Sequence, residues 1–332
     1  MSMSRLNVIP RVSLSHSPTP LEAMPKLSKL LNRNIFVKRD DCTGLSGGGN
    51  KTRKLEYLVA DALAANADTL VTVGGIQSNH ARQTAAAAAQ FGLKCELVLE
   101  DVKGTPKFDY YHNGNILLNN LLGATVHRLS EEENCTDYAD ELMNELQAKG
   151  KNPYFIPMGG SNEIGSLGYI QCAQEIISQI NEQKIALDHI VLATGSAGTQ
   201  AGLLAGLILA GVDIPVLGVC VSRPENEQVD IVTALLKKTL TLIGLDPKLV
   251  KNRVFANGNY YGDGYGIPTD KMIEAVRLCA QNEGLILDPV YTGKGMSGLI
   301  DLCRTDVFDE KDNILFIHTG GSQGIYAYQE IF

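Results

Sequence analysis

The chain has 332 residues, of which 44% are hydrophobic and 20% are charged, as is typical of a globular protein with a substantial core. Its net charge of −8 argues against a nucleic acid as the main partner, and no apolar run approaches the roughly 20 residues of a membrane-spanning helix. The seven cysteines are scattered and form no Cys-x-x-Cys pair, which argues against a disulfide framework or a structural zinc site. Because residues 1–5 also lack a secretory apolar segment, we expect a cytoplasmic protein without a bound metal or a membrane partner.

In chain order, short apolar runs alternate with glycine turns and helical segments. The first strand is expected at residues 34–40, and a helix is expected to begin at Lys51. A second helix should open after Ser78 and run to about residue 89. Further strands of the first half are expected at residues 69–73, 95–99, 125–129 and 154–157. This alternation predicts parallel strands with covering helices.

The pattern restarts at Gly159–Gly160, with a helix expected at about residues 168–180. Strands of the second half are expected at residues 189–193, 216–221 and 314–317, whereas residues 245–265 show no clear pattern. The whole therefore predicts an α/β fold with open, mainly parallel sheets. Ligands of such sheets bind outside the carboxyl ends of the strands. The glycine turns that follow four strands should therefore line one cleft, namely Gly74–Gly75, Gly159–Gly160, the Gly195 turn and Gly320–Gly321.

The most informative stretch is the glycine turn at residues 47–49 together with the helix that follows it. Asn50 is a good helix N-cap, which puts Lys51 at the first helical position and Lys54 on the same face. Two neighbouring ammonium groups lower each other's pKa, so the arrangement suits an anion, a reactive amine or both. Two basic residues that are simply solvated are the ordinary alternative. The spacing is not that of a phosphate-binding P-loop, because Asn50 separates the last glycine from Lys51.

Three other segments offer chemistry. The loop at residues 194–199 presents backbone amides, hydroxyl groups and a helix start, which suits a phosphate without a nucleoside, although a plain turn is equally compatible. Ser78 can cap its helix or help to bind a carboxylate, and His80 by itself says little. Tyr291 can stack on a ring or pack in the core. A reactive lysine, a phosphate cradle and a nearby aromatic ring together indicate pyridoxal phosphate.

Five segments resemble the D-cysteine desulfhydrase and 1-aminocyclopropane-1-carboxylate deaminase family, namely residues 48–57, 76–80, 194–199, 288–294 and 318–321. The resemblance spans essentially the whole chain. It implies a fold-type II pyridoxal phosphate enzyme, similar to the tryptophan synthase β subunit, with two α/β domains. The large domain would comprise residues 1–47 and 163–332, and the small domain residues 48–162. It also implies a homodimer and a small amino-acid substrate.

The resemblance further implies roles for individual residues. Lys51 would hold the cofactor as a Schiff base and then move the Cα proton of the substrate. The phosphate would be held by Lys54 together with Gly195, Ser196, Ala197, Gly198 and Thr199. Asn79 would bond the phenolic oxygen of the cofactor, and Thr292 and Thr319 would lie at its ring. The substrate would be bound by Ser78, Asn79, His80 and Gly160. Tyr291 would lie near the leaving group, with Tyr265 as its helper.

Two positions bear on the type of reaction. Deaminases of the family carry Glu where this chain has Thr292 and Leu where it has Thr319. Two hydroxyl groups make the cofactor ring a weaker electron sink than a carboxylate does, which favours elimination of sulfide over ring opening. We therefore expect D-cysteine to be converted to pyruvate, sulfide and ammonia. L-cysteate sulfo-lyase remains the first alternative, the deaminase the second, and a nonenzymatic module that senses a phosphorylated ligand the third.

Overall fold

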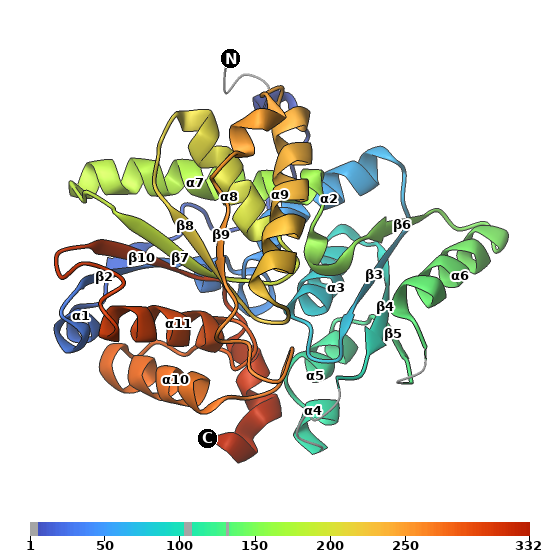
Figure 1. Cartoon of the computed structure of the whole chain (residues 1–332). Helices are drawn as coiled ribbons and strands as arrows, with labels where there is room; N and C mark the ends of the chain where they lie inside the picture. The colour runs from blue at the N-terminus through green and yellow to red at the C-terminus, as the bar shows by residue number, and fades with distance from the viewer. Residues whose placement is uncertain (1–5, 103–107, 131–132) are drawn as a thin grey trace.

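The computed structural model describes residues 6–102, 108–130 and 133–332, so that residues 1–5, where we expected no secretory segment, lie outside the described part. The described strands form two separate sheets (Figure 1). Within these same ranges, every helix is too short or too polar to traverse a lipid bilayer. The predicted α/β class with open, mainly parallel sheets is confirmed.

The larger sheet has the strand order β1-β2-β10-β7-β8-β9. Its strands are β1 (Leu21–Ala23), β2 (Asn34–Arg39), β7 (His189–Thr194), β8 (Val216–Cys220), β9 (Phe255–Asn257) and β10 (Asn313–His318). The edge strand β1 is antiparallel to β2, and the other pairs are parallel. The central strand β10 pairs with both β2 and β7, and its residues from Ile314 to His318 are buried because helices cover both faces of the sheet.

The smaller sheet has the strand order β5-β4-β3-β6, and all its pairs are parallel. Its strands are β3 (Thr69–Gly75), β4 (Lys94–Glu100), β5 (Thr125–Arg128) and β6 (Pro153–Ile156). Every residue of the central strand β3 is buried, which explains why this strand reads as a continuous apolar run.

Helices cover both faces of the larger sheet (Figure 1). One face carries α7 (Glu163–Gln183), α8 (Gly198–Ala210) and α9 (Glu225–Leu242), and the other carries α1 (Pro25–Leu31), α10 (Asp270–Glu283) and α11 (Thr292–Arg304). Helices α7 and α8 pack closely because α8 presents glycine there. A Cβ on Gly202 would lie 2.1 Å from the carbonyl oxygen of Ser166 on α7.

The helices of the smaller sheet divide between its two faces. The face toward the larger sheet carries α2 (Lys51–Ala64), α3 (Asn79–Phe91) and α5 (Gly114–Leu121), whereas α6 (Cys135–Ala148) covers the outer face. The short helix α4 (Phe108–His112) precedes α5. Helix α2 also packs closely on α7. Only a glycine fits at the contact, since a Cβ added to Gly168 on α7 would lie 2.2 Å from the carbonyl oxygen of Arg53 on α2. Helix α2 therefore bridges the helical layers of the two sheets.

All the expected strands form, and the structure contains two further strands that the sequence pattern did not predict. These are β1 and β9, each three residues long and each at an edge of the larger sheet, where too few residues exist to show alternation. Helix α7 begins at Glu163 and not near residue 168, because Asn162 caps it. The division into two domains stays a prediction, and the smaller sheet draws its strands from residues 69–156.

Candidate active site

The glycine turn before α2 is required by close backbone packing. Gly47, Gly48 and Gly49 have φ values of +80°, +76° and +131°, and a Cβ on Gly48 would lie 1.8 Å from the carbonyl oxygen of Asp41. Asn50 occupies the N-cap position, but the predicted side-chain cap is wrong. Its amide group donates to Thr199 Oγ1 at 2.9 Å and accepts from Lys51 Nζ at 2.9 Å. The side chain therefore links α2 to the first turn of α8.

Lys51 stands at the centre of the site. Its side chain is buried, and Nζ lies 5.3 Å from the centroid of the Tyr291 ring. Burial lowers the pKa of Lys51 to about 8, the charge of Arg82 adds to the decrease, and Asp288 opposes it. We expected each lysine to lower the pKa of the other. The decrease is found at Lys54, whose pKa is lowered first by burial and then by the charge of Lys51. An appreciable fraction of Lys51 is consequently an unprotonated amine near neutral pH.

The loop between β7 and α8 lies beside Lys54 and brings together groups that could bind an anion. Nζ of Lys54 donates to the carbonyl oxygen of Gly159 at 3.0 Å and to Ser161 Oγ at 3.1 Å. A Cβ on Gly198 would lie 2.9 Å from this Nζ, so the backbone at the start of α8 approaches the amine closely. The first amides of a helix are free of intrahelical partners and lie at its positive end. The chemistry of these donors suits a phosphate dianion.

A cavity of about 430 Å³ opens beside Lys51. Of the residues predicted for the site, it is lined by Lys51, Ser78, His80, Gly195, Ser196, Tyr265 and Tyr291. A much smaller cavity adjoins it and is lined by Lys51, Gly195, Ser196, Ala197, Thr199, Tyr291 and Thr319. Among the described residues, five predicted members line neither cavity, namely Lys54, Asn79, Gly160, Gly198 and Thr292. Three of the four glycine turns line the larger cavity, and the turn of Gly320 and Gly321 does not. Gly321 packs against Asn79 instead, since a Cβ added to Gly321 would lie 2.5 Å from Asn79 Nδ2.

The start of α3 supplies three predicted residues. Ser78 Oγ accepts from the amide of Ala81 at 3.2 Å, so the predicted N-cap is confirmed, and the same side chain lines the cavity. Asn79 Oδ1 accepts from Asn115 Nδ2 at 2.8 Å, which leaves its own amide nitrogen for other partners. Gly160 packs against His80, since an added Cβ would lie 3.4 Å from His80 Cε1.

The hydrogen bonds of His80 define its tautomer. Thr72 Oγ1 donates its proton to the carbonyl oxygen of Ile156 at 2.7 Å, so it can only accept from His80 Nε2 at 2.9 Å. Burial, and then the charges of Lys51 and Lys54, lower the pKa of His80 well below its ordinary value. The ring is therefore neutral, and its Nδ1 is a buried acceptor with no partner within the described part of the chain. This acceptor adds to the polar groups of the site.

Two tyrosines from different segments meet on the other side of the cavity. The hydroxyl groups of Tyr265 and Tyr291 lie 2.8 Å apart. Burial raises the pKa of Tyr291 to about 12 and that of Tyr265 well above its ordinary value. Both hydroxyl groups therefore keep their protons near neutral pH and can act as hydrogen-bond donors.

The two threonines that we expected at the cofactor ring differ in their surroundings. Thr319 lines the smaller cavity, whereas the Thr292 hydroxyl donates to Asp288 Oδ1 at 2.6 Å and accepts from the amide of Asp288 at 2.7 Å. The expectation that both hydroxyl groups lie at the cofactor ring stays a prediction. A buried carboxylate lies one hydrogen bond behind Thr292.

Several cavity residues were missed as members of the site, namely Glu100, Asp101, Arg223 and Asp263. Glu100 is the last residue of β4 and the others lie in segments that follow strands, and no local pattern distinguishes them from solvated charges. Arg82 on α3 was also missed. It is buried and binds the carbonyl oxygens of Ser46 and Gly48, which lie beside the glycine turn.

A family described as "Pyridoxal-phosphate dependent enzyme" matches residues 12–320. The chain is 46% identical over 328 residues to the D-cysteine desulfhydrase of Klebsiella pneumoniae and 45% identical over 328 residues to that of Salmonella typhi, each covering 99% of both chains. Among solved structures, an ACC deaminase homologue superposes with a TM-score of 0.90 at 38% identity, over 99% of this chain and 98% of the other. Diaminopropionate ammonia lyase from Escherichia coli, at 18% identity over 99% of this chain and 91% of the other, shares the fold with a TM-score of 0.70.

Proposed function

Because the chain belongs to the family of pyridoxal-phosphate dependent enzymes, we propose that it is a carbon–sulfur lyase that converts D-cysteine to pyruvate, sulfide and ammonia. The observation that carries the proposal is the Lys51 amine, which is buried at the edge of both cavities with its pKa lowered to about 8. The choice of D-cysteine is supported by the full-length similarity to D-cysteine desulfhydrases. Since the family is one of enzymes, the nonenzymatic alternative is set aside.

The donor groups of the site fit the cofactor. Lys51 and residues 194–197 and 199 at the start of α8 line the same small cavity, which adjoins the larger one, so groups suited to a phosphate lie beside the amine that would bind a carbonyl group. Lys54 and the loop of residues 195–199 would hold the phosphate, and Asn79 and Thr319 would contact the ring. We propose these roles together with that of Lys51.

Bound pyridoxal phosphate supplies an electron-withdrawing ring that stabilises negative charge at the Cα of an amino acid. Lys51 contributes a base whose pKa of about 8 lies near neutral pH, and a base transfers protons most efficiently when its pKa is close to the surrounding pH. Its Nζ is held by Asn50 Oδ1 at 2.9 Å, so the amine has a defined direction before substrate arrives. We assign to Lys51 the removal of the Cα proton.

The start of α3 would bind the substrate carboxylate. A helix of 13 residues has free amides and a positive end at its N-terminus, and both favour a carboxylate there. Ser78 lies at that end and lines the cavity, so its hydroxyl group can reach the same anion. Two-point binding of this kind would orient the Cα proton toward Lys51.

The tyrosine pair would act on the leaving group. Both hydroxyl groups are protonated, and each can donate while the other accepts, because only 2.8 Å separates them. A donor in this position would stabilise the negative charge that develops on the departing sulfur. The hydroxyl group of Tyr291 would contact the sulfur, and Tyr265 would orient that hydroxyl group through the hydrogen bond between the two tyrosines. The three-carbon product then reacts with water to give pyruvate and ammonia.

A substrate panel tests the reaction. We expect the unmodified protein to release sulfide and pyruvate from D-cysteine, and to act poorly on 1-aminocyclopropane-1-carboxylate. L-cysteate is the second candidate, because the half-buried Arg223 lines the cavity and a guanidinium group pairs well with a sulfonate. Sulfide, sulfite and ammonia should be measured separately for each compound. Efficient ring opening without sulfide from D-cysteine would contradict the proposal.

Replacing Ser78 with alanine separates binding from capping. Loss of the cap should cost about 1 kcal/mol of unfolding free energy. Loss of a hydrogen bond to a carboxylate should lower kcat/KM per folded molecule by about 10- to 100-fold in addition. Asn134→Ala is the matched control, because Asn134 caps α6 on the outer face of the smaller sheet. It should lower stability only. Equal kcat/KM in the Ser78→Ala and unmodified proteins would leave Ser78 as a cap alone.

We extend the proposal to a cytoplasmic homodimer with the domain boundaries given above, as the resemblance implies. The seven cysteines are free thiols, and six of them are buried, which fits a reducing compartment.

A further inference from the structure

A buried run of hydrogen bonds connects three polar side chains on α3 and α5. Arg82 Nε donates to Asn115 Oδ1 at 2.7 Å, and Asn115 Nδ2 donates to Asn79 Oδ1 at 2.8 Å. Arg82 and Asn115 are fully buried, and Asn79 is 8% exposed. Asn115 lines neither of the two cavities, and the site as proposed does not use it.

The partners of Asn115 allow only one orientation of its side-chain amide. Burial lowers the pKa of Arg82 to about 10, so the guanidinium group is still charged near neutral pH and can only donate. Asn115 Nδ2 also donates to the carbonyl oxygen of Gln77 at 2.9 Å, and a carbonyl oxygen can only accept. Asn115 must therefore turn Oδ1 toward Arg82 and Nδ2 toward Gln77 and Asn79.

This orientation is passed on to Asn79. Since Asn115 offers a proton at their contact, Asn79 must present its oxygen there, and its own Nδ2 is turned away from Asn115. Nδ2 lies against the turn that follows β10, because a Cβ added to Gly321 would lie 2.5 Å from it. The same turn begins at Thr319, which lines the smaller cavity. The end of Asn79 that lies against this turn is therefore a donor.

From this geometry we propose that Asn115 is a positioning residue for the cofactor. It holds Asn79 so that an N–H group, and not an oxygen, meets the phenolic oxygen of pyridoxal phosphate, and Arg82 fixes Asn115 in turn. An Asn79 amide turned the other way would bring two oxygens together and repel the cofactor. The inference rests on the proposed contact between Asn79 and the cofactor, and it adds two residues to which the motif comparison assigned no role.

The test compares two ligands that differ only at the phenolic oxygen. Dissociation constants of the cofactor-free full chain for pyridoxal phosphate and for 3-deoxypyridoxal phosphate are measured by absorption titration. Asn115→Asp keeps an acceptor for Arg82, with which it forms an ion pair, but offers no proton to Asn79. Asn79 should then turn Nδ2 toward the new carboxylate. The preference for pyridoxal phosphate over the deoxy compound should therefore fall by about 10-fold or more.

Two further variants serve as controls. Asn79→Ala removes the donor itself and should lower the preference, and adding Asn115→Asp to it should lower the preference no further, because the two residues act in series. Asn113→Asp places the same carboxylate at the N-cap of α5, where Asn113 Oδ1 accepts from the amide of Gly114 at 2.8 Å. Aspartate can accept that bond equally well, so the preference should be unchanged.

The measurement requires no D-cysteine, so a chain that acts on another substrate would give the same ratios. The proposed reaction and this inference can therefore fail separately. An unchanged preference in Asn115→Asp would overturn the inference. So would an equal loss of affinity for both ligands, because the effect would then not pass through the phenolic oxygen.

Circular dichroism identifies variants that do not fold. If Asn115→Asp does not fold, Asn115→Ala replaces it, because it also removes the donor to Asn79. Loss of the hydrogen bond that orients Asn79 should then lower the preference by about 2- to 10-fold. A failure of both variants to fold would assign Asn115 a structural role alone and overturn the proposal.

Discussion

Lys51→Ala is expected to lose the visible absorption of the bound cofactor and nearly all turnover. Loss of a general base alone costs about 10²- to 10⁴-fold in rate, and loss of the covalent link to the cofactor adds to this. The absorption spectrum, with and without borohydride, and the rate of sulfide release from D-cysteine measure the two effects. A cofactor bound to Lys51 should be trapped there by borohydride and found on the peptide that contains it.

Lys294→Met is the matched control for Lys51→Ala. The pKa of Lys294 is also lowered to about 8 by burial. Its Nζ, however, donates to the carbonyl oxygens of Tyr261 and Gly264 at 2.7 and 2.8 Å, and Lys294 lines neither cavity among the described residues. The absorption band should therefore survive in Lys294→Met. A band that persists in Lys51→Ala would refute the proposed role of Lys51 and make Lys294 the next candidate.

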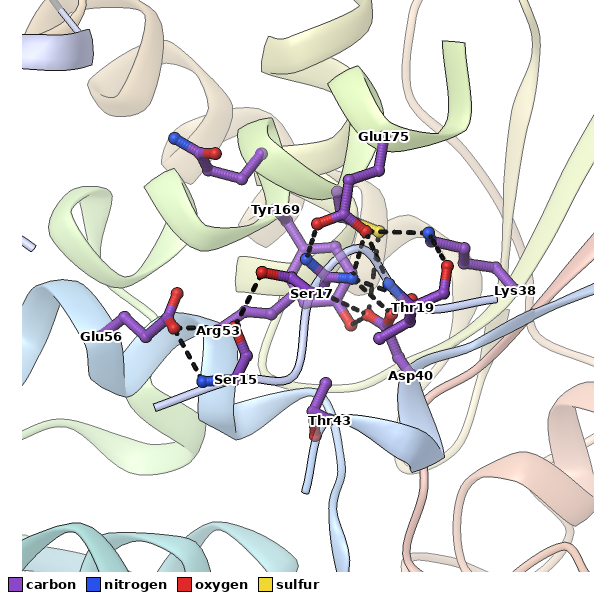
Figure 2. Close-up of polar contacts among 12 residues, drawn as sticks. Ser15, Ser17, Thr19, Lys38, Asp40, Thr43, Arg53, Glu56, Tyr169 and Glu175 are labelled. Carbon is purple, nitrogen blue, oxygen red and sulfur yellow. Dashed lines mark hydrogen bonds and ion pairs between the residues drawn. The ribbon is translucent and has the colours of Figure 1, made fainter. Parts of the chain in front are cut away.

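Asp40→Ala is expected to cost about 3–5 kcal/mol of unfolding free energy, since it removes one of the two carboxylates that pair with the buried Arg53. Asp40 is fully buried and binds Arg53 through two hydrogen bonds of 2.8 and 2.9 Å (Figure 2). Arg53 is equally bound to Glu175, and Lys38 donates to Glu175 at 2.8 Å. The cluster of Lys38, Asp40, Arg53 and Glu175 thus joins the larger sheet, α2 and α7.

Urea unfolding measures the loss of unfolding free energy in Asp40→Ala. Glu274→Ala is the control, because it removes a carboxylate from an exposed ion pair. The pair of Glu274 and Arg304 is about half exposed, so its loss should cost less than about 1 kcal/mol. Burial by itself would raise the pKa of Asp40, but Arg53 lowers it below the ordinary value. Its contribution to stability is therefore complete above about pH 4 and is lost as the pH falls through the lower folded value. A variant Asp40→Ala as stable as the unmodified protein would show that the cluster is energetically neutral.

This cluster also has a geometric consequence for the site. Arg53 follows Lys51 by two positions on α2, which is about 200° around the helix, so one face of α2 is anchored while the opposite face carries Lys51. Lys54 returns to the face of Lys51 one turn later. The ion pairs of Arg53 therefore anchor the first turn of α2, from which Lys51 and Lys54 extend on the opposite face.

The sequence by itself determined the class of fold and the elements that carry the site. Continuous apolar runs such as β3 and β10 could be recognised because strands buried on both faces need no polar alternation. The start of α2 and the cap at Ser78 were equally legible, since both depend on neighbours within four residues. Features such as caps and helix starts depend on residues that are consecutive in the sequence, so they can be recognised without the structure. The family motif that includes Lys51 is also a run of consecutive residues.

The tertiary structure alone decided which distant groups meet. Asn50 was expected to cap α2, but its side chain donates at 2.9 Å to Thr199 at the start of α8, a helix of the larger sheet. No local pattern distinguished Arg53, yet it is buried and bound by Asp40 and Glu175. Strands β1 and β9 form only because a neighbouring strand offers its edge. In each case the deciding partner lies outside the local run of residues, so the free energy that selects the contact does not exist until these segments have packed together.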